Sequence, residues 1–165
     1  MWNTPDICDD YPTQVTPLAP LYQNFGGVKA FSGEVETVKC FEDNSRVKEL
    51  LSTPGHGRVL VVDGGASLRC ALIGDLIAAS AIENGWSGIV IRGCCRDVHE
   101  LQTMPFGVRA LASIPLKSTR KGAGESGVTI DMDGVEVRPG MWLYADETGM
   151  LISDESLPIE TGHRD

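Results

Sequence analysis

The sequence lacks several features that define whole classes of protein. It contains no run of about 18 apolar residues, so no membrane-spanning helix is expected. Its first six residues are polar and acidic, so a secretory signal is not expected either. Basic residues are scarce, with 14 lysines and arginines against 23 acidic residues and a net charge of -9. Direct nucleic-acid binding is disfavoured, because it needs a basic face. A pocket for one small anion and docking on a basic protein are both compatible with the net charge.

A disulfide framework is also missing. The cysteines are odd in number, no Cys-x-x-Cys occurs and the three histidines are scattered, so neither disulfides nor a zinc site is expected. Together with the missing signal, this composition predicts reduced thiols and a cytoplasmic protein. The adjacent pair Cys94-Cys95 is interpreted as packing near a turn rather than as a redox switch, because small apolar side chains suit that position. The other cysteines are Cys8, Cys40 and Cys70.

What the sequence does contain is the alternation typical of an α/β fold. A length of 165 residues, 42% of them hydrophobic, predicts one domain over residues 1–165 with a real core. Continuous apolar runs at 58–63 and 88–91 are typical of strands buried on both faces of a parallel sheet. The alanine-rich segment 76–84 between them predicts a helix that ends at Asn84-Gly85. Strand, helix and strand in this order predict a βαβ unit with a right-handed crossover.

The other segments predict one more helix and a mainly antiparallel second half. Residues 42–51 begin with a helix-start pattern and place apolar residues on one face. Residues 117–127 form a polar, basic loop that contains glycine, and the polar tail after Leu157 is expected to fray. Further strands are expected at 30–41, 109–116, 128–130, 135–137, 142–145 and 150–153.

Two junctions between strands and helices hold candidate functional residues, because ligands of open α/β sheets collect where strands end and helices begin. The first junction is Gly74-Asp75-Leu76-Ile77, whose backbone N–H groups at a helix start are suited to a substrate carboxylate. The alternative is that Asp75 caps an ordinary helix, and spacing alone favours this alternative.

The second junction is Arg96-Asp97-Val98-His99-Glu100, which follows a strand and an expected Gly-Cys-Cys turn. Arginine offers a planar fork for carboxylate or enolate oxygens, and aspartate offers a hard oxygen ligand for a divalent metal. On the pattern alone, a solvated and charged helix start is the favoured interpretation. His99 is a candidate base or ligand, but exposure to solvent is favoured for it.

Two weaker signals lie elsewhere in the chain. A glycine pair follows a strand at residues 63–67 and suggests a phosphate cradle, but a complete P-loop spacing is missing. The basic run 117–121 suggests an anion site, although such a run is more often a solvated loop. The pattern alone assigns a function to neither.

Four segments of the chain closely resemble the RraA-like family. They are residues 22–27 (YQNFGG), 37–44 (TVKCFEDN), 57–65 (GRVLVVDGG) and 144–149 (YADETG). The resemblance runs from residue 6 to residue 159, which is the expected core of the domain. It implies a swivelling β/β/α domain with a central, barrel-like sheet flanked by helices. It also implies a ring-shaped homotrimer, with a dimer of trimers as the open alternative.

The family resemblance implies two activities. One branch contains class II 4-hydroxy-4-methyl-2-oxoglutarate aldolases, which also decarboxylate oxaloacetate. The other contains regulators of ribonuclease activity, which inhibit ribonuclease E. The aldolase branch carries a glycine, a spacer and then Arg-Asp-x-x-Asp/Glu, which Gly74 and residues 96–100 resemble with a spacer one residue longer. Regulators that lack the aspartate after the arginine are expected to lack the lyase activity, whereas this chain has both residues.

The resemblance therefore implies a metal-dependent lyase. It assigns Asp97 as the ligand of a divalent cation, Mg²⁺ or Mn²⁺, and Arg96 as the group that stabilises the pyruvate enolate. The backbone N–H groups of residues 74–77 are expected to hold the carboxylate of a small α-keto acid. Asp75 and Glu100 are expected to orient metal-bound water, and an acidic residue of a neighbouring subunit is a further expected contributor.

Two other functions compete with this interpretation. The charge of -9 suits an acidic ring that docks on basic ribonuclease E, with Asp154, Glu155 and Glu160 as exposed acidic candidates. A methyltransferase that uses a nucleotide cofactor is disfavoured, because no Gly-x-Gly-x-x-Gly loop directly joins a predicted strand to a helix.

Overall fold

The structure is a computed structural model that describes residues 1–159. It contains four helices within these residues, most of them short, and twelve strands. In chain order the elements are α1 (Thr4–Asp10), β1 (Val15–Pro17), β2 (Gln23–Asn24), β3 (Phe31–Lys39), α2 (Ser45–Leu51), β4 (Val59–Asp63), β5 (Ala71–Ile73), α3 (Asp75–Glu83), β6 (Gly88–Cys95), α4 (Val98–Leu101), β7 (Gly107–Ser113), β8 (Glu125–Ser126), β9 (Ile130–Met132), β10 (Val135–Val137), β11 (Trp142–Ala145) and β12 (Met150–Ser153).

A mixed sheet of ten strands dominates the fold. The strand order is β1-β12-β11-β3-β4-β6-β7-β2, with β5 beside β6 and β8 beside β3. The central strands β3, β4, β6 and β7 are parallel, and the outer strands pair in an antiparallel manner. Every residue of β4 is buried, as its continuous apolar run predicts. The expected unit of strand, helix and strand is confirmed as β4, α3 and β6, although β5 lies between β4 and α3 and was not predicted.

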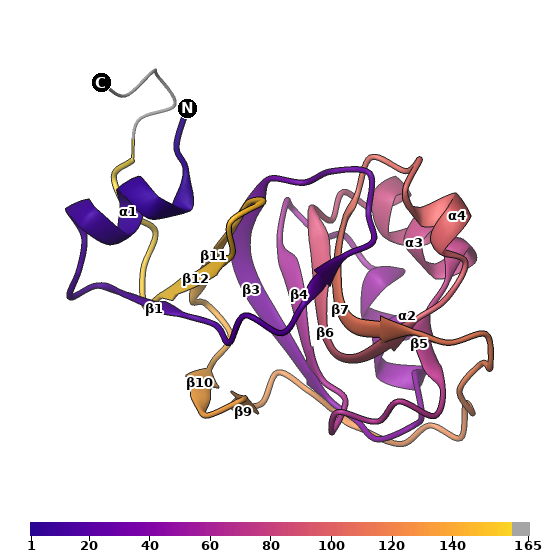
Figure 1. Cartoon of the computed structure of the whole chain (residues 1–165). Coiled ribbons are helices and arrows are strands. Elements are labelled where there is room, and N and C mark those ends of the chain that lie inside the picture. The colour runs from indigo at the N-terminus through magenta and orange to yellow at the C-terminus, as the bar shows by residue number, and fades with distance from the viewer. Residues whose placement is uncertain (160–165) are drawn as a thin grey trace.

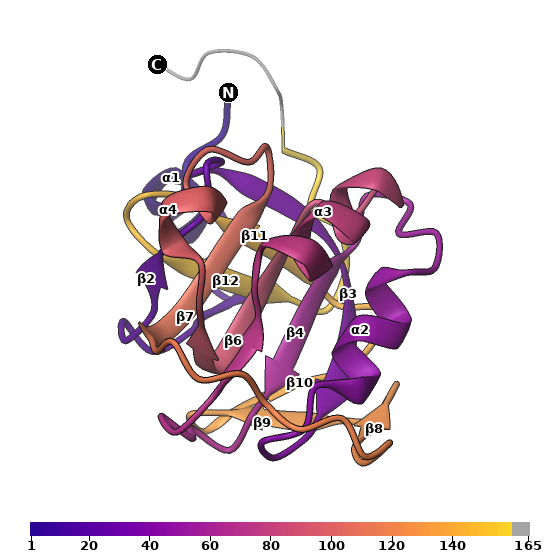
Figure 2. The ribbon, with the colours of Figure 1, turned by 90° about the vertical axis from the view of Figure 1, so that its right-hand side faces the viewer.

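The two faces of the sheet bury separate cores. Helices α2, α3 and α4 cover one face, where Leu60, Ile89 and Phe106 are fully buried (Figure 2). On the other face, residues such as Val90 and Leu143 pack where β11, β12 and the β9–β10 hairpin curl over the sheet (Figure 1). This arrangement confirms the expected α/β fold with a barrel-like sheet flanked by helices.

Helix α1 lies at the edge of the molecule, outside β11 and β12 (Figure 1). Ile7 packs there against Tyr144 and Leu151 in a third apolar cluster. The sequence contained the signals of this helix, because the side chain of Asn3 accepts a hydrogen bond from the N–H of Asp6 and a proline occupies the first turn. These signals were missed because the helix spans only 7 residues.

The structure corrects two local expectations. Strand β6 continues to Cys95, so Cys94 and Cys95 lie inside a strand and the expected Gly-Cys-Cys turn is wrong. Cys94 is held between β5 and β7, opposite Ala71 and Ala112, and this central position buries the thiols. The strand expected at 109–116 instead covers 107–113, because the chain leaves the sheet toward the candidate site. All five cysteines are free, as expected.

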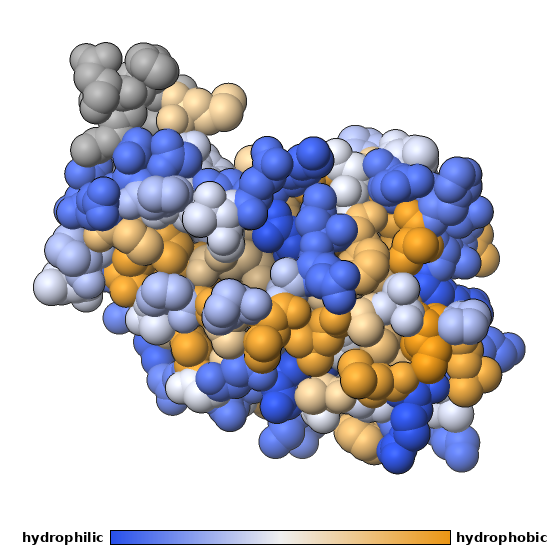
Figure 3. All heavy atoms as spheres, viewed as in Figure 1, coloured by the Kyte–Doolittle hydropathy of each residue, from blue (hydrophilic) through white to orange (hydrophobic). Residues whose placement is uncertain are grey.

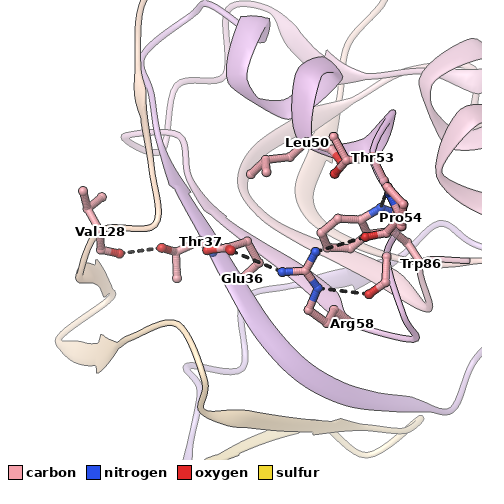
Figure 4. Close-up of polar contacts among 9 residues, drawn as sticks. Glu36, Thr37, Leu50, Thr53, Pro54, Arg58, Trp86 and Val128 are labelled. Atoms are coloured by element: carbon pink, nitrogen blue, oxygen red, sulfur yellow. Dashed lines mark hydrogen bonds and ion pairs between the residues drawn. The ribbon is translucent and has the colours of Figure 1, made fainter. Parts of the chain in front are cut away.

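Arg58 ties together the loops at the amino ends of the parallel strands (Figure 4). Its guanidinium carbon lies 4.6 Å from the centre of the Trp86 ring, and Nη1 pairs with Glu36 at 3.3 Å. Nε and Nη2 donate hydrogen bonds to the carbonyl oxygens of Gly55 and Pro54. Because each nitrogen has a partner, this arginine serves the fold at the end of the sheet opposite to the candidate site.

No helix within residues 1–159 is long and apolar enough to cross a membrane. The polar tail that was expected to fray lies mostly outside the described residues, as does Glu160. Asp154 and Glu155 are exposed, as expected.

Candidate active site

The carboxyl ends of β5 and β6 open into a cavity of about 600 Å³. This is the edge of a parallel sheet at which ligands are expected to bind. Three segments form its walls, namely the start of α3 (74–77), the end of β6 (Arg96 and Asp97) and the loop 116–120. The structure therefore brings the two predicted junctions together in one cavity.

Asp97 is held in an unusual backbone conformation directly after β6. Its φ of 58° and ψ of 43° lie in the left-handed region, which is uncommon for residues other than glycine and often marks functional sites. This conformation directs the carboxylate toward the start of α3, where Oδ2 accepts a hydrogen bond of 2.9 Å from the N–H of Asp75. The Asp75 N–H is therefore already engaged, and the predicted carboxylate cradle at 74–77 is reduced by one donor.

Gly74 allows this approach because it has no side chain. A Cβ at position 74 would lie 2.4 Å from Oδ2 of Asp97 and 3.4 Å from Nε of Arg96. The φ of Gly74 is −138°, which any residue can adopt, so the requirement for glycine here is one of space and not of backbone freedom. The glycine of the predicted motif thus makes room for the arginine and the aspartate.

Asp75 and Asp97 place two carboxyl groups side by side at the cavity. Partial burial raises the pKa of Asp75, and the hydrogen bond and negative charge of Asp97 raise it further. Glu100 adds a smaller effect of the same sign through its charge. Glu100 itself lies exposed on α4 and does not line the cavity, so it influences the pair only from a distance.

The guanidinium of Arg96 has no acidic partner among the described residues. Its one hydrogen bond within this part of the chain runs from Nη1 to the carbonyl oxygen of Pro115, at 3.3 Å. The side chain is half-buried and lines the cavity. A planar, positively charged fork is thus available to oxygen atoms of a bound anion.

The opposite wall contains Arg120, which the sequence analysis considered only as part of the basic run 117–121, and Asn44, which it did not consider as a site residue. Arg120 lines the cavity, and its Nε donates a hydrogen bond of 3.1 Å to Oδ1 of Asn44. Asn44 is buried, and its Nδ2 donates to the carbonyl oxygen of Leu72. The basic run 117–121 was interpreted as a solvated loop. Lys117, Thr119 and Arg120 are exposed, which agrees with this interpretation, whereas Ser118 is buried, and all four residues also line the cavity.

Asp43 anchors this loop beside the cavity. Its Oδ2 accepts hydrogen bonds from the N–H groups of Lys121, at 2.7 Å, and Ala123, at 3.4 Å. Burial alone would raise the pKa of Asp43, but these bonds and those from Ser45 lower it to about 2. The only signal in the sequence was the basic character of the loop, because its anchors lie more than 70 positions earlier in the chain.

The remaining candidates lie outside this cavity. His99 is exposed, as expected. In the segment 63–67, Oδ1 of Asp63 accepts a hydrogen bond from the N–H of Gly65 and pairs with Arg92 at 3.2 Å. The glycine pair therefore forms part of a turn whose polar groups already have partners, which leaves no support for a phosphate cradle.

Comparison with known proteins agrees with this geometry. Residues 4–152 match the sequence profile of the RraA-like family, described as Aldolase/RraA. The chain belongs to the RraA-like family. A protein of Laribacter hongkongensis (strain HLHK9), named "Putative 4-hydroxy-4-methyl-2-oxoglutarate aldolase", is 54% identical over 154 residues, which cover 93% of this chain and 97% of that protein. A protein of Pseudomonas putida (strain W619) with the same name is 53% identical over 156 residues, which cover 94% and 96%.

Two solved structures of similar length share the RraA-like fold. One is described as the RNA-processing inhibitor RraA from Thermus thermophilis, with a TM-score of 0.93, 43% identity and 99% of each chain covered. The other is described as S-adenosylmethionine: 2-dimethylmenaquinone methyltransferase from Geobacillus kaustophilus HTA426, with a TM-score of 0.93, 40% identity and coverage of 98% and 100%. One RraA-like fold is thus found under three different functional names.

The glycines of this RraA-like chain do not form a dinucleotide-binding turn. Gly122, Gly124 and Gly127 have the spacing Gly-x-Gly-x-x-Gly, but they lie around β8, which pairs with β3, and are followed by β9. The nucleotide-binding turn requires this motif between a strand and the start of a helix. The motif is thus present in spacing but not in structural context.

The donor groups at the cavity suit a cation that takes few protein ligands. Within residues 1–159, no group of three His, Cys, Asp or Glu residues is arranged to hold a metal ion. Mg²⁺ usually keeps several waters and binds one or two carboxylates together with substrate oxygens. The pair of Asp97 and Asp75 fits a cation of this kind, and it does not fit a structural zinc site.

Proposed function

We propose that this RraA-like protein is a divalent-metal-dependent lyase that cleaves 4-hydroxy-4-methyl-2-oxoglutarate into two pyruvates. We also propose a secondary oxaloacetate decarboxylase activity, because both reactions pass through the pyruvate enolate. The observation that carries the proposal is that Arg96, which has no acidic partner among the described residues, meets the Asp75–Asp97 carboxyl pair in one cavity. The names of the relatives at 53–54% identity support the same reaction class.

Each residue has a defined task in this proposal. Asp97 would hold the cation, Mg²⁺ or Mn²⁺, and Asp75 beside it would orient water bound to the cation. The bound cation supplies Lewis-acid stabilisation of negative charge on the substrate oxygens. Cleavage of the carbon–carbon bond places a developing negative charge on the former carbonyl oxygen. Arg96 binds that oxygen more tightly as its charge grows, which lowers the barrier rather than strengthening substrate binding uniformly.

The rest of the cavity positions the substrate. Backbone N–H groups at the start of α3, from Leu76 and Ile77, receive the carboxylate next to the keto group. Arg120, oriented by Asn44 from the opposite wall, receives the second carboxylate of a dicarboxylic substrate. Asp75 orients the water that takes the proton of the C4 hydroxyl.

The proposal extends to assembly and location. A homotrimer, alone or as a dimer of trimers, would bring an acidic residue of a neighbouring subunit to the cavity, and the protein would act in the cytoplasm. Exposed apolar side chains at the rim support contact with another subunit, since Leu76 is 81% and Leu116 is 62% exposed.

The test is the release of pyruvate from 4-hydroxy-4-methyl-2-oxoglutarate and from oxaloacetate, in the presence of Mg²⁺ or Mn²⁺. We expect both reactions with either metal, loss of both after chelation and recovery when the metal is restored. Rates must exceed the rate of oxaloacetate decay with free metal alone. Absence of enzyme-dependent pyruvate release with every divalent metal would refute the lyase.

The second candidate function is binding and inhibition of ribonuclease E. It is supported by the net charge of -9 and by the 43% identity to a structure described as an RNA-processing inhibitor. Binding of an acidic surface to a basic partner weakens with salt, because exposed charges are screened beyond about 10 Å at 0.1 M ionic strength. A pull-down at low and high salt tests this function. No association at low salt would remove it.

The two functions depend on different surfaces and are therefore separable. Asp97→Ala is expected to abolish pyruvate release and to leave ribonuclease binding intact. Charge reversal of the exposed residues Asp154 and Glu155 is expected to weaken ribonuclease binding and to leave pyruvate release intact. A variant at either surface that affected both measurements equally would contradict this separation.

A further inference from the structure

Among residues 1–159, Arg109 is a buried cation without an acidic partner. It lies in the middle of β7 and is 4% exposed, and no carboxylate among the described residues lies within 4.0 Å of its guanidinium. Nη2 donates hydrogen bonds to the carbonyl oxygens of Lys29 and Asp146, at 2.6 and 3.0 Å, whereas Nε has no partner. A buried charge is costly unless an opposite charge compensates it. An anion is therefore expected beside this side chain.

The two nearest acidic side chains are engaged elsewhere. The carboxylate of Asp146 accepts hydrogen bonds from the N–H and the hydroxyl of Thr4, both at 2.7 Å, and from the N–H of Thr148 at 3.0 Å. Glu147 lines the same cavity as Arg109, but its side chain is largely exposed and faces Lys29 at 4.0 Å. Burial lowers the pKa of Arg109, and Asp146 and Glu147 oppose this effect only through their charge at a distance. The guanidinium stays charged, since arginine does not lose its proton in proteins.

Arg109 lines a second cavity, of about 470 Å³, which shares no residue with the cavity of Arg96. Its neighbours in β7, Val108 and Ala110, pack in the core under the helices, so Arg109 points to the opposite face of the sheet. Its guanidinium carbon lies 5.6 Å from the centre of the Phe31 ring. The second cavity is therefore separated from the candidate active site by the sheet itself.

The walls of the second cavity are mostly apolar. Leu18, Pro20, Tyr22 and Met150 contribute apolar surface beside the charged Arg109. In the orientation of Figure 1, Figure 3 shows apolar residues gathered between α1 and the chain that follows β1. Cavities of 300–1,000 Å³ with apolar walls and a few placed polar groups are typical of small-molecule sites.

We propose that the second cavity binds a small organic carboxylate with a short apolar body. The carboxylate pairs with the guanidinium of Arg109, and the apolar body lies against Leu18, Tyr22 and Met150. This site is independent of the proposed lyase, because neither its residues nor its test involve Asp97 or metal.

The test uses the full-length protein and hexanoate as the probe, with the neutral hexanamide as its uncharged counterpart. Isothermal titration calorimetry is expected to give one hexanoate per chain and binding of hexanamide at least about tenfold weaker, because the charge-assisted hydrogen bonds are lost. Arg109→Gln is expected to weaken hexanoate binding by the same factor. The matched control Arg138→Gln removes an exposed arginine outside the cavity and is expected to bind as the wild type does.

A second variant keeps the test decisive if Arg109→Gln fails to fold. Gly149 lines the second cavity, and a Cβ built on it meets no atom within 4 Å. Gly149→Phe is thus expected to fill the cavity while Arg109 and the fold are retained, and to abolish hexanoate binding. Ala79→Phe, at an exposed position of α3 outside the second cavity, is the control for surface change.

Three results would overturn the proposal. The first is absence of hexanoate binding at millimolar concentration in the wild type. The second is binding that survives both Arg109→Gln and Gly149→Phe but is lost in Arg96→Gln, which would locate it in the other cavity. The third is a combination of two findings, namely that the wild type does not bind hexanoate and that Arg109→Gln changes the oligomeric state. This combination would indicate that the acidic partner of Arg109 comes from a second copy of the chain.

Discussion

Arg92 and Arg96 lie four residues apart at the end of β6, and their surroundings are opposite. Arg92 pairs with Asp63 at 3.2 Å and with Asp133 at 2.9 Å, and Asp133 also accepts a hydrogen bond of 2.6 Å from the hydroxyl of Tyr22. Arg96 contacts only the carbonyl oxygen of Pro115 among the described residues. One arginine is thus surrounded by partners, and the other faces a cavity with its charge uncompensated.

The different surroundings of Arg92 and Arg96 distinguish charges that stabilise the fold from charges that are available for function. The Arg92 group fixes the β9–β10 hairpin on the sheet, because Asp133 lies in the turn between those two strands. Burial by itself would raise the pKa of Asp133, but Tyr22 and Arg92 lower it overall, as in a stable ion pair. Charges that have their partners stabilise the fold, whereas the charges at the cavity are left for a ligand.

The largest effect is expected from removal of the carboxylate next to Arg96. Asp97→Ala should lower kcat for pyruvate release by about 10²- to 10³-fold or more, because both the cation ligand and its position are lost. The protein should stay folded, since Asp97 is half-buried and, among the described residues, the hydrogen bonds of its carboxylate all go to Asp75. Steady-state kinetics and circular dichroism check the two statements. A variant with the activity of the wild type would show that Asp97 does not bind the cation.

Replacement of each arginine by lysine tests the comparison directly. Arg96→Lys keeps the charge but loses the planar fork, so kcat should fall by roughly 10- to 100-fold with little change in metal affinity or Tm. Arg92→Lys should leave kcat nearly unchanged and lower the free energy of unfolding by about 1–2 kcal/mol, because one of its two acidic partners is left poorly paired.

Kinetics and urea unfolding of both lysine variants give the readout. An unchanged kcat with a raised KM in Arg96→Lys would mean that this arginine only binds substrate. A large loss of stability in Arg96→Lys would contradict the distinction between the two arginines.

A methyl group at position 74 should disturb the site more than the fold. In Gly74→Ala the new Cβ would lie 2.4 Å from Oδ2 of Asp97, so the carboxylate must move away from the N–H of Asp75. We expect about a tenfold lower kcat/KM and a small change in Tm, since misplacement by 1 Å is enough for such losses. Gly149→Ala is the matched control, because its Cβ meets no atom within 4 Å. Equal effects of the two variants would refute the role of Gly74.

The smallest effect concerns the acid dependence of stability. The pKa of Asp43 is about 2 in the folded protein and about 3.9 for an unfolded aspartate, so its carboxylate stabilises the fold above pH 4. This contribution is lost as the pH falls from about 4 to about 2, because the unfolded state takes up a proton in this range while the carboxylate of the folded state stays ionised. Asp43→Asn should flatten this part of the stability curve, measured by urea unfolding at several pH values. The exposed Asp154→Asn is the control and should keep the slope of the wild type.

Local patterns in the sequence predicted most of the fold. Apolar runs predicted β4 and β6, and an alanine-rich segment predicted α3. In these elements the burial of the side chains follows directly from the composition and from the periodicity of the apolar residues. The short strands β5 and β8 were missed, because pairing with distant strands stabilises a few residues more than their own propensity does, and α1 was missed because it spans only 7 residues. The end of β6 was misplaced because Cys94 and Cys95 pair on both sides with strands that the pattern did not reveal.

The sequence by itself contained Gly74 and the adjacent Arg96 and Asp97 as candidates for chemistry, because residue types and spacing are local properties, and the family resemblance favoured them over an ordinary helix start. Only the tertiary structure decided which charges are compensated. Arg92 meets an aspartate 41 positions later, and Arg120 meets an asparagine 76 positions earlier, whereas Arg96 and Arg109 meet no acid among the described residues. These outcomes depend on strand register and on the course of loops across the sheet. Spacing along the chain does not contain that information, because contacts between distant residues form only when the whole sheet is assembled.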